Sequence, residues 1–137
     1  MVERTVKICG KEVLMCYCTA TETGYEAISG KSSVIFIPKV TKDDKGNITS
    51  VESQANVADC ITLAMAGIIA SYTRRKEKAP ITSDDILYEG TPEEVQNLIT
   101  TILNMRNEWY QVPSLIKKEG GTDQSQDDSS DSDDQKN

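Results

Sequence analysis

The side chains most able to do chemistry in this 137-residue chain are four cysteines and, ahead of the acidic end, two pairs of adjacent aspartates. The cysteines are Cys9, Cys16, Cys18 and Cys60, and the chain has no histidine. Structural zinc sites use paired C-x2-4-C knuckles, whereas these cysteines supply only one C-x-C, so we expect free reduced thiols and no metal. Without histidine, the usual general base and every Ser-His or Cys-His nucleophile are missing as well.

The two acidic pairs, Asp43-Asp44 and Asp84-Asp85, both fall in segments that we interpret as turns. Adjacent carboxylates in turns more often accept hydrogen bonds from backbone amides than share a proton. The sequence also has no phosphate-binding glycine-rich loop, no H-E-x-x-H, no EF-hand loop and no nucleophile elbow. We therefore interpret the protein as a non-enzymatic one, without cofactor or small-molecule substrate.

The charge distribution divides the chain into a nearly neutral body and an acidic end. The net charge is −7, of which residues 121–137 carry −5, so the body is close to neutral and gives no sign of nucleic-acid binding. No apolar residue occurs from position 120 onward, too little to offset the entropy of ordering that segment. We predict a single α+β domain over residues 1–119 and a disordered acidic tail over 120–137.

Two features predict a protein of the cytoplasm rather than of a membrane. Arg4 and Lys7 interrupt any apolar core of a signal peptide, so we expect a cytosolic chain. The most apolar run lies between Asp59 and Arg74 and is shorter than the roughly 20 residues that cross a bilayer. That run belongs in the core of the domain.

Helical spacing predicts two long helices, over about 56–76 and 92–110. In the first, Val57, Ile61, Met65, Ile68 and Tyr72 recur on one broad apolar face. The second begins with the capping box at 91–94, which has proline at its first helical position, and continues with apolar residues at helical spacing up to position 109. A shorter helix is expected over 19–30, where a glycine ends it.

Two further segments favour β-hairpins. Residues 4–18 alternate around a Gly10-Lys11 turn, which gives one wholly apolar face formed by Val6, Ile8, Val13, Met15 and Tyr17. Residues 33–52 form a possible second hairpin with strands at 34–38 and 48–51, although a loop stays open as an alternative because Pro38 confines its strand to an edge. The predicted fold is α+β and mainly helical, with the N-terminal hairpin packed on a small bundle.

Two helix faces without charge are candidate partner-binding surfaces. Opposite the core face of the first long helix lies a stripe of small residues: Leu63, Ala66, Gly67 and Ala70. The second long helix carries the polar residues Asn97, Thr101 and Asn104, and it places Arg106 within its apolar face. Small residues admit a close neighbour, and amides lose water more cheaply than charged groups, so we expect all eight residues near self-association or partner surfaces. For Arg106, extension to solvent and an ion pair with Asp59 are the alternatives.

Three short motifs, in this order of elements, resemble the tail assembly chaperones of long-tailed bacteriophages. In that family a strand-turn-strand with a G-K-x-φ turn precedes a helix that ends in Y-E-x-φ-T/S-G-K. The corresponding segments here are Gly10-Lys11-Glu12-Val13 and Tyr25-Glu26-Ala27-Ile28-Ser29-Gly30-Lys31. A later T-x-E-E-V helix start is matched by Thr91-Pro92-Glu93-Glu94-Val95.

The resemblance implies a protein that binds the phage tape-measure protein and keeps it soluble while the tail tube assembles. The expected partners are that protein and further copies of this chain, with no nucleic acid, membrane or small molecule. Two other interpretations stay open. One is a virion or head-tail connector component, and the other is a small regulatory protein that binds nucleic acid through the basic residues 74–76.

Overall fold

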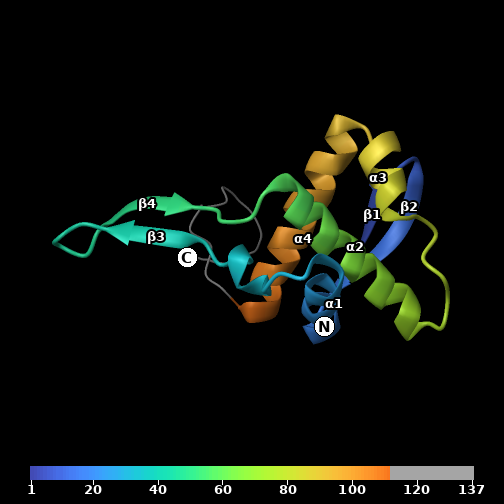
Figure 1. Ribbon diagram of the computed structural model, residues 1–137, viewed down its shortest axis with the longest axis horizontal. Coiled ribbons are helices and arrows are strands. Elements are labelled where there is room, and N and C mark those ends of the chain that lie inside the picture. The colour runs from blue at the N-terminus through green and yellow to red at the C-terminus, as the bar shows by residue number, and fades with distance from the viewer. Residues whose placement is uncertain (112–137) are drawn as a thin grey trace, which may run out of the picture.

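The computed structural model describes residues 1–111, which fold into helices and two antiparallel hairpins (Figure 1). The elements are β1 (Val2–Ile8), β2 (Lys11–Tyr17), α1 (Thr19–Ser29), the 3-10 helix η1 (Ser33–Phe36), β3 (Lys39–Lys42), β4 (Ile48–Glu52), α2 (Val57–Arg74), α3 (Ser83–Glu89) and α4 (Pro92–Tyr110). The predicted α+β, mainly helical fold is confirmed, as are both long helices. The acidic tail predicted over 120–137 and the domain end at 119 lie outside the described residues.

The first hairpin turns at Cys9-Gly10 rather than at Gly10-Lys11. Both turn residues have positive φ, 55° and 73°, as in the primed turns that match strand twist. The register pairs Val6 with Val13 and Ile8 with Lys11, a shift of two residues from the predicted pairing. Because side chains alternate with a period of two, this shift leaves every residue on its predicted face. All five residues of the predicted apolar face are buried.

Helix α2 runs through the middle of the molecule (Figure 1). It packs against α1, against β2 and against α4, and Asn56 caps its start by accepting a hydrogen bond from the backbone N–H of Asp59. Ten of its eighteen residues are buried, on all sides of the helix. A helix that is apolar nearly all round is thus the centre of this domain.

Glu94 joins the first hairpin to the start of α4. Its carboxylate accepts hydrogen bonds from the backbone N–H groups of Cys9 and Gly10, at 3.1 and 3.2 Å, and from that of Thr91 at 3.2 Å. These backbone hydrogen bonds hold the pKa of Glu94 below its ordinary value. The predicted capping-box residue therefore also fixes the hairpin turn.

The second hairpin exists, but its first strand begins later than predicted. Residues 33–36 form η1 instead of a strand, because the Ser32 side chain accepts a hydrogen bond from the backbone N–H of Val34 and bends the chain. Strand β3 starts only after Pro38 and pairs with β4. Phe36 anchors the segment by packing edge-on against Tyr25, with ring centroids 4.9 Å apart. All nine strand residues are exposed, and the hairpin projects from the body (Figure 1).

Candidate partner-binding groove

The aspartates and cysteines that could do chemistry have structural roles within residues 1–111. One member of each acidic pair behaves as predicted: Asp43 accepts hydrogen bonds from the backbone N–H groups of Lys45 and Asn47, and Asp85 accepts one from that of Thr82. The four thiols are free, and burial raises the pKa of Cys16 and Cys60. No group of three potential ligands in this part of the chain is arranged to hold a metal ion.

The described part of the chain contains no helix that is a candidate for crossing a membrane. None of the helices within residues 1–111 has both the length and the apolar character that a membrane span requires. The longest one, α4, has nineteen residues and carries polar side chains along one side.

The stripe of small residues on α2 is not an exposed surface, so this part of the prediction was wrong for Leu63, Ala66 and Gly67. All three are buried inside the chain, where β2 and α1 cover them. A Cβ on Gly67 would lie 2.6 Å from the Cys16 carbonyl oxygen, and the Ala66 Cβ faces Gly24. Small residues permit a close neighbour, but the sequence does not say whether that neighbour belongs to the same chain. Ala70, at the edge of the stripe, is half-buried.

The polar residues of α4 lie apart from Arg106. Asn97 and Asn104 are exposed and Thr101 is half-buried, on the side of α4 that faces away from the core. Asn97 also lines a shallow hollow together with Lys7 and Thr91. The structure therefore does not gather the eight predicted residues into one surface, and a partner role for these three stays a prediction.

Arg106 neither extends into solvent nor forms an ion pair with Asp59, which were the two alternatives for it. Its side chain is buried, with the residue only 8% exposed, so it does not extend into solvent. Asp59 accepts hydrogen bonds from Lys31 at 2.9 Å and from Tyr25 at 3.2 Å and forms no ion pair with Arg106. The guanidinium carbon instead lies 4.8 Å from the centre of the Tyr110 ring, and Nε has no hydrogen-bond partner among the described residues.

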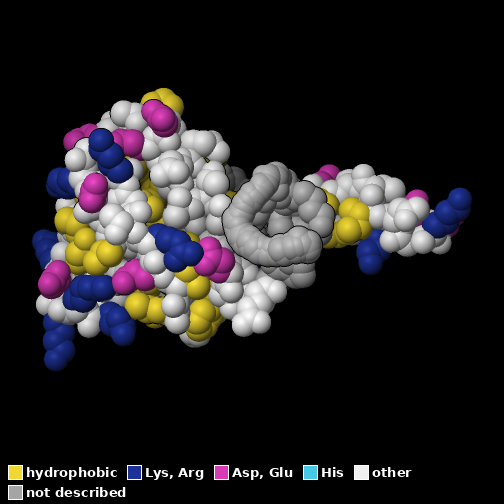
Figure 2. Space-filling model, turned by 180° about the vertical axis from the view of Figure 1, so that it is seen from behind, with side chains coloured by type: hydrophobic (Ala, Val, Ile, Leu, Met, Phe, Trp, Pro, Cys, Tyr) yellow, Lys and Arg dark blue, Asp and Glu magenta, His cyan; other side chains and the backbone are white. Residues whose placement is uncertain are grey.

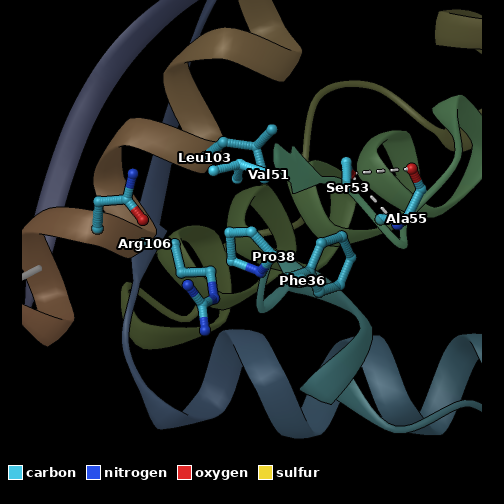
Figure 3. A pocket seen from close by; sticks show the side chains of 8 residues that line it. Phe36, Pro38, Val51, Ser53, Ala55, Leu103 and Arg106 are labelled. Atoms are coloured by element: carbon cyan, nitrogen blue, oxygen red, sulfur yellow. Dashed lines mark hydrogen bonds between the residues drawn. The ribbon is translucent and has the colours of Figure 1, made fainter. Parts of the chain in front are cut away.

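Arg106 lines a groove between α4 and the base of the second hairpin, which we call the hairpin groove (Figure 3). Its volume is about 280 Å³, and its lining residues are Phe36, Pro38, Val51, Ser53, Ala55, Leu103, Arg106 and Asn107. Figure 3 shows Leu103 of α4 next to Val51 of β4, and Arg106 next to Pro38. The groove is thus mostly apolar, with one buried cation.

The hairpin groove continues onto one face of the second hairpin. Val40 and Val51 are directly opposite partners, and Ile48 pairs with Lys42 beyond a bulge, which brings all three aliphatic side chains to one face. They are 41–51% exposed, and Val51 also lines the groove. Figure 2 shows hydrophobic side chains near the base of this projecting arm and Lys or Arg side chains farther out. An apolar surface therefore runs from α4 onto the hairpin, where Lys42 lies on the same face beside Ile48.

Sequence reasoning missed this groove because its residues come from three segments far apart in the chain. The available signals were the apolar run 34–38 and an arginine within the apolar face of α4. Neither signal says that η1, β4 and α4 meet.

One residue of the basic run 74–76, Arg75, has a structural role in the fold. Both terminal nitrogens of Arg75 bind the Glu3 carboxylate, at 2.8 and 3.0 Å, and Ser71 donates a further hydrogen bond to it. These contacts lower the pKa of Glu3 to about 2. Arg75 thus ties β1 to the end of α2, which leaves the exposed Arg74 and Lys76 as the cations of the predicted basic patch.

Comparison with known proteins adds no relative to this description. The chain matches no protein family, no curated protein and no solved structure.

Proposed function

We propose that this protein is a non-enzymatic tail assembly chaperone of a phage or prophage. In this proposal it acts in the bacterial cytoplasm, binds the tape-measure protein and keeps it soluble while the tail tube assembles. The single observation that carries the binding role is the projecting hairpin whose apolar face leads into the hairpin groove. The identity of the client comes from the resemblance of residues 10–13, 25–31 and 91–95 to the chaperone family.

The exposed hairpin supports a binding role because it contributes little to its own stability. A two-stranded hairpin is marginal alone in water, and here none of its strand residues is buried. If another chain covered its three aliphatic side chains, their apolar surface would be removed from water, which is favourable. A contiguous exposed apolar surface of this kind is typical of a protein-protein contact.

The shape of the surface suits a helical client. An amphipathic helix binds by laying its apolar side into a groove, using anchors spaced three or four residues apart. The hairpin groove has apolar walls from Phe36, Pro38 and Leu103, which accept aliphatic side chains with little discrimination. Weak discrimination is what a chaperone needs when its client is one long, helix-forming chain.

The self-association that the resemblance implies has a candidate location at the free edge of β4. Strand β3 follows Pro38 and carries Lys39 and Lys42, which are residues that discourage pairing with another chain. Strand β4 has neither proline nor lysine. We expect any dimer of the purified chain to pair through β4, and sedimentation of a Ser50→Lys variant tests this, because lysine on an edge strand discourages pairing with another chain.

Co-expression with the tape-measure protein of the same genome tests the proposed function. We expect the tape-measure protein to be soluble and to copurify with the full chain, and to be insoluble when expressed alone. An insoluble tape-measure protein in the presence of the folded chain would contradict the proposal. Recovery of the chain from purified virions would favour a structural component of the particle instead.

A further inference from the structure

Arg106 is a buried cation without an anion among the described residues. Burying a charge is costly unless it is paired and hydrogen-bonded. Arg106 is 8% exposed, and within residues 1–111 its Nε has no hydrogen-bond partner and it forms no ion pair. Stacking on Tyr110 at 4.8 Å offsets part of this cost, but an aromatic ring supplies no acceptor for Nε.

Three acidic residues on α1, α2 and α4 have hydrogen-bond partners other than Arg106. Glu22 accepts hydrogen bonds from the hydroxyl groups of Tyr17 and Tyr110, at 2.6 to 2.7 Å. On α4 itself, Glu108 pairs with Arg4 at 2.6 Å, and on α2 Asp59 pairs with Lys31. Glu108 and Asp59 thus pair with cations, Glu22 is bound by two neutral hydroxyl groups, and no carboxylate within residues 1–111 forms an ion pair with Arg106.

The position of Arg106 places it where a bound chain would meet it. It lines the hairpin groove next to Pro38, with Leu103 one turn earlier on the same helix (Figure 3). A segment lying in the groove would contact aliphatic and aromatic walls and, beside them, the guanidinium. An arginine fork pairs with a carboxylate through two parallel hydrogen bonds, which gives geometric selectivity as well as affinity.

We propose that the hairpin groove binds an amphipathic helix that carries a carboxylate beside its apolar face, and that this carboxylate pairs with Arg106. The inference rests on the proposed function, because it specifies the chemistry of the client segment. Among the helices of the tape-measure protein, those with an Asp or Glu three or four residues from their apolar anchors are then selected, and those with Lys or Arg at that position are excluded.

The test separates binding from folding through the Arg106→Met variant of the full chain. Methionine keeps an unbranched apolar stem and removes the charge. We expect the denaturant midpoint to stay the same or to rise, because an unpaired buried charge is removed. A purely structural Arg106, held by its stacking on Tyr110, would instead lower that midpoint on removal. Arg4→Met is the matched control, since Arg4 is exposed and pairs only with Glu108.

Overlapping peptides that tile the tape-measure protein are the binding probe, titrated against the wild-type chain, R106M, R106K and R4M. We expect R106M to weaken the best peptide by about 30-fold or more, R4M to leave it unchanged, and R106K to fall between. Replacing the peptide's acidic residue by its amide should weaken wild-type binding equally and R106M binding no further. Equal binding by wild type and R106M would overturn this inference and leave the proposed function standing. Failure of the wild-type chain to bind any peptide would overturn both.

Discussion

Gly67 of α2 and Cys16 of β2 bring the central helix and the first hairpin into backbone contact. A Cβ on Gly67 would lie 2.6 Å from the Cys16 carbonyl oxygen, and the Cys16 thiol donates a hydrogen bond to the Gly67 carbonyl at 3.6 Å. The same hypothetical Cβ would lie 3.1 Å from Met15 and 3.3 Å from Ile102. Gly67 of the small-residue stripe is therefore where the first hairpin packs on α2, and Ala66 of the same stripe faces Gly24 of α1, so both residues contribute to folding.

Gly67→Ala should destabilise the protein, although alanine is the better helix former. The added methyl group meets backbone, which cannot move aside as a flexible side chain can, so we expect a loss of roughly 2 kcal/mol in the free energy of unfolding. Urea unfolding measures it. Gly24→Ala is the control, because its Cβ would meet only the Ala66 Cβ, at an ordinary 3.4 Å. The control should be neutral or stabilising by up to about 1 kcal/mol, and equal effects of the two substitutions would contradict this packing.

The ion pair between Glu3 and Arg75 should make the free energy of unfolding depend on pH in the acid range. Arg75 and Ser71 lower the pKa of Glu3 from 4.5 to about 2. A lowered carboxyl pKa contributes stability that is present above the unfolded value and is lost as the pH falls from about 5 to 2. Because both side chains are partly exposed, we expect only about 1 kcal/mol from this pair.

Comparison of Glu3→Gln with the wild-type chain separates the contribution of Glu3 to the pH dependence of stability from that of the other carboxyl groups. Urea midpoints at neutral pH should be lower for the variant, and the difference should shrink toward zero near pH 2. A gap between the two proteins that stays constant over this range would mean that Glu3 does not titrate as described.

Phe36 should be the residue that holds the second hairpin to the body. It is buried and packs edge-on against Tyr25, whereas its neighbour Val34 is 55% exposed. We expect Phe36→Ala to cost about 3 kcal/mol and Val34→Ala to cost less than about 0.5 kcal/mol. Urea unfolding gives both values, and hydrogen exchange of the β3 and β4 amides should be faster in the Phe36 variant. Unchanged exchange would show that another contact anchors the hairpin.

The four thiols should react in two groups. Cys16 and Cys60 are buried, and burial raises their pKa, so both accessibility and thiolate fraction are low. Cys9 and Cys18 are half-buried. Titration of the native protein with a thiol reagent at about pH 8 should therefore modify Cys16 and Cys60 only on unfolding, as mass spectrometry of the labelled peptides would show. Rapid labelling of Cys16 in the folded chain would be inconsistent with its place under α2.

Elements that follow from a repeating pattern of residues were predictable from the sequence. Features that depend on contacts between segments far apart in the chain were not. The faces of the first hairpin survived a displaced turn, because a shift of two residues preserves alternation. The capping box of α4 was read directly from Thr91 and Glu94. The burial of Gly67 and the meeting of Val51 with Leu103 depend on tertiary contacts that no local pattern encodes.

The central claim is that the apolar hairpin face and the hairpin groove form the binding surface for the tape-measure protein. The direct measurement is the soluble yield of that protein when it is co-expressed with a Val40→Lys/Val51→Glu variant, whose opposite charges face each other across the hairpin. Both valines are exposed, so the free energy of unfolding should stay within about 0.5 kcal/mol of the wild type. The control carries Ile69→Lys and Leu87→Lys, at apolar positions that are equally exposed but lie away from the hairpin.

We predict that wild type and control keep the tape-measure protein soluble and copurify with it, and that the hairpin variant does neither while remaining folded. Full solubilisation by a folded hairpin variant would contradict the claim.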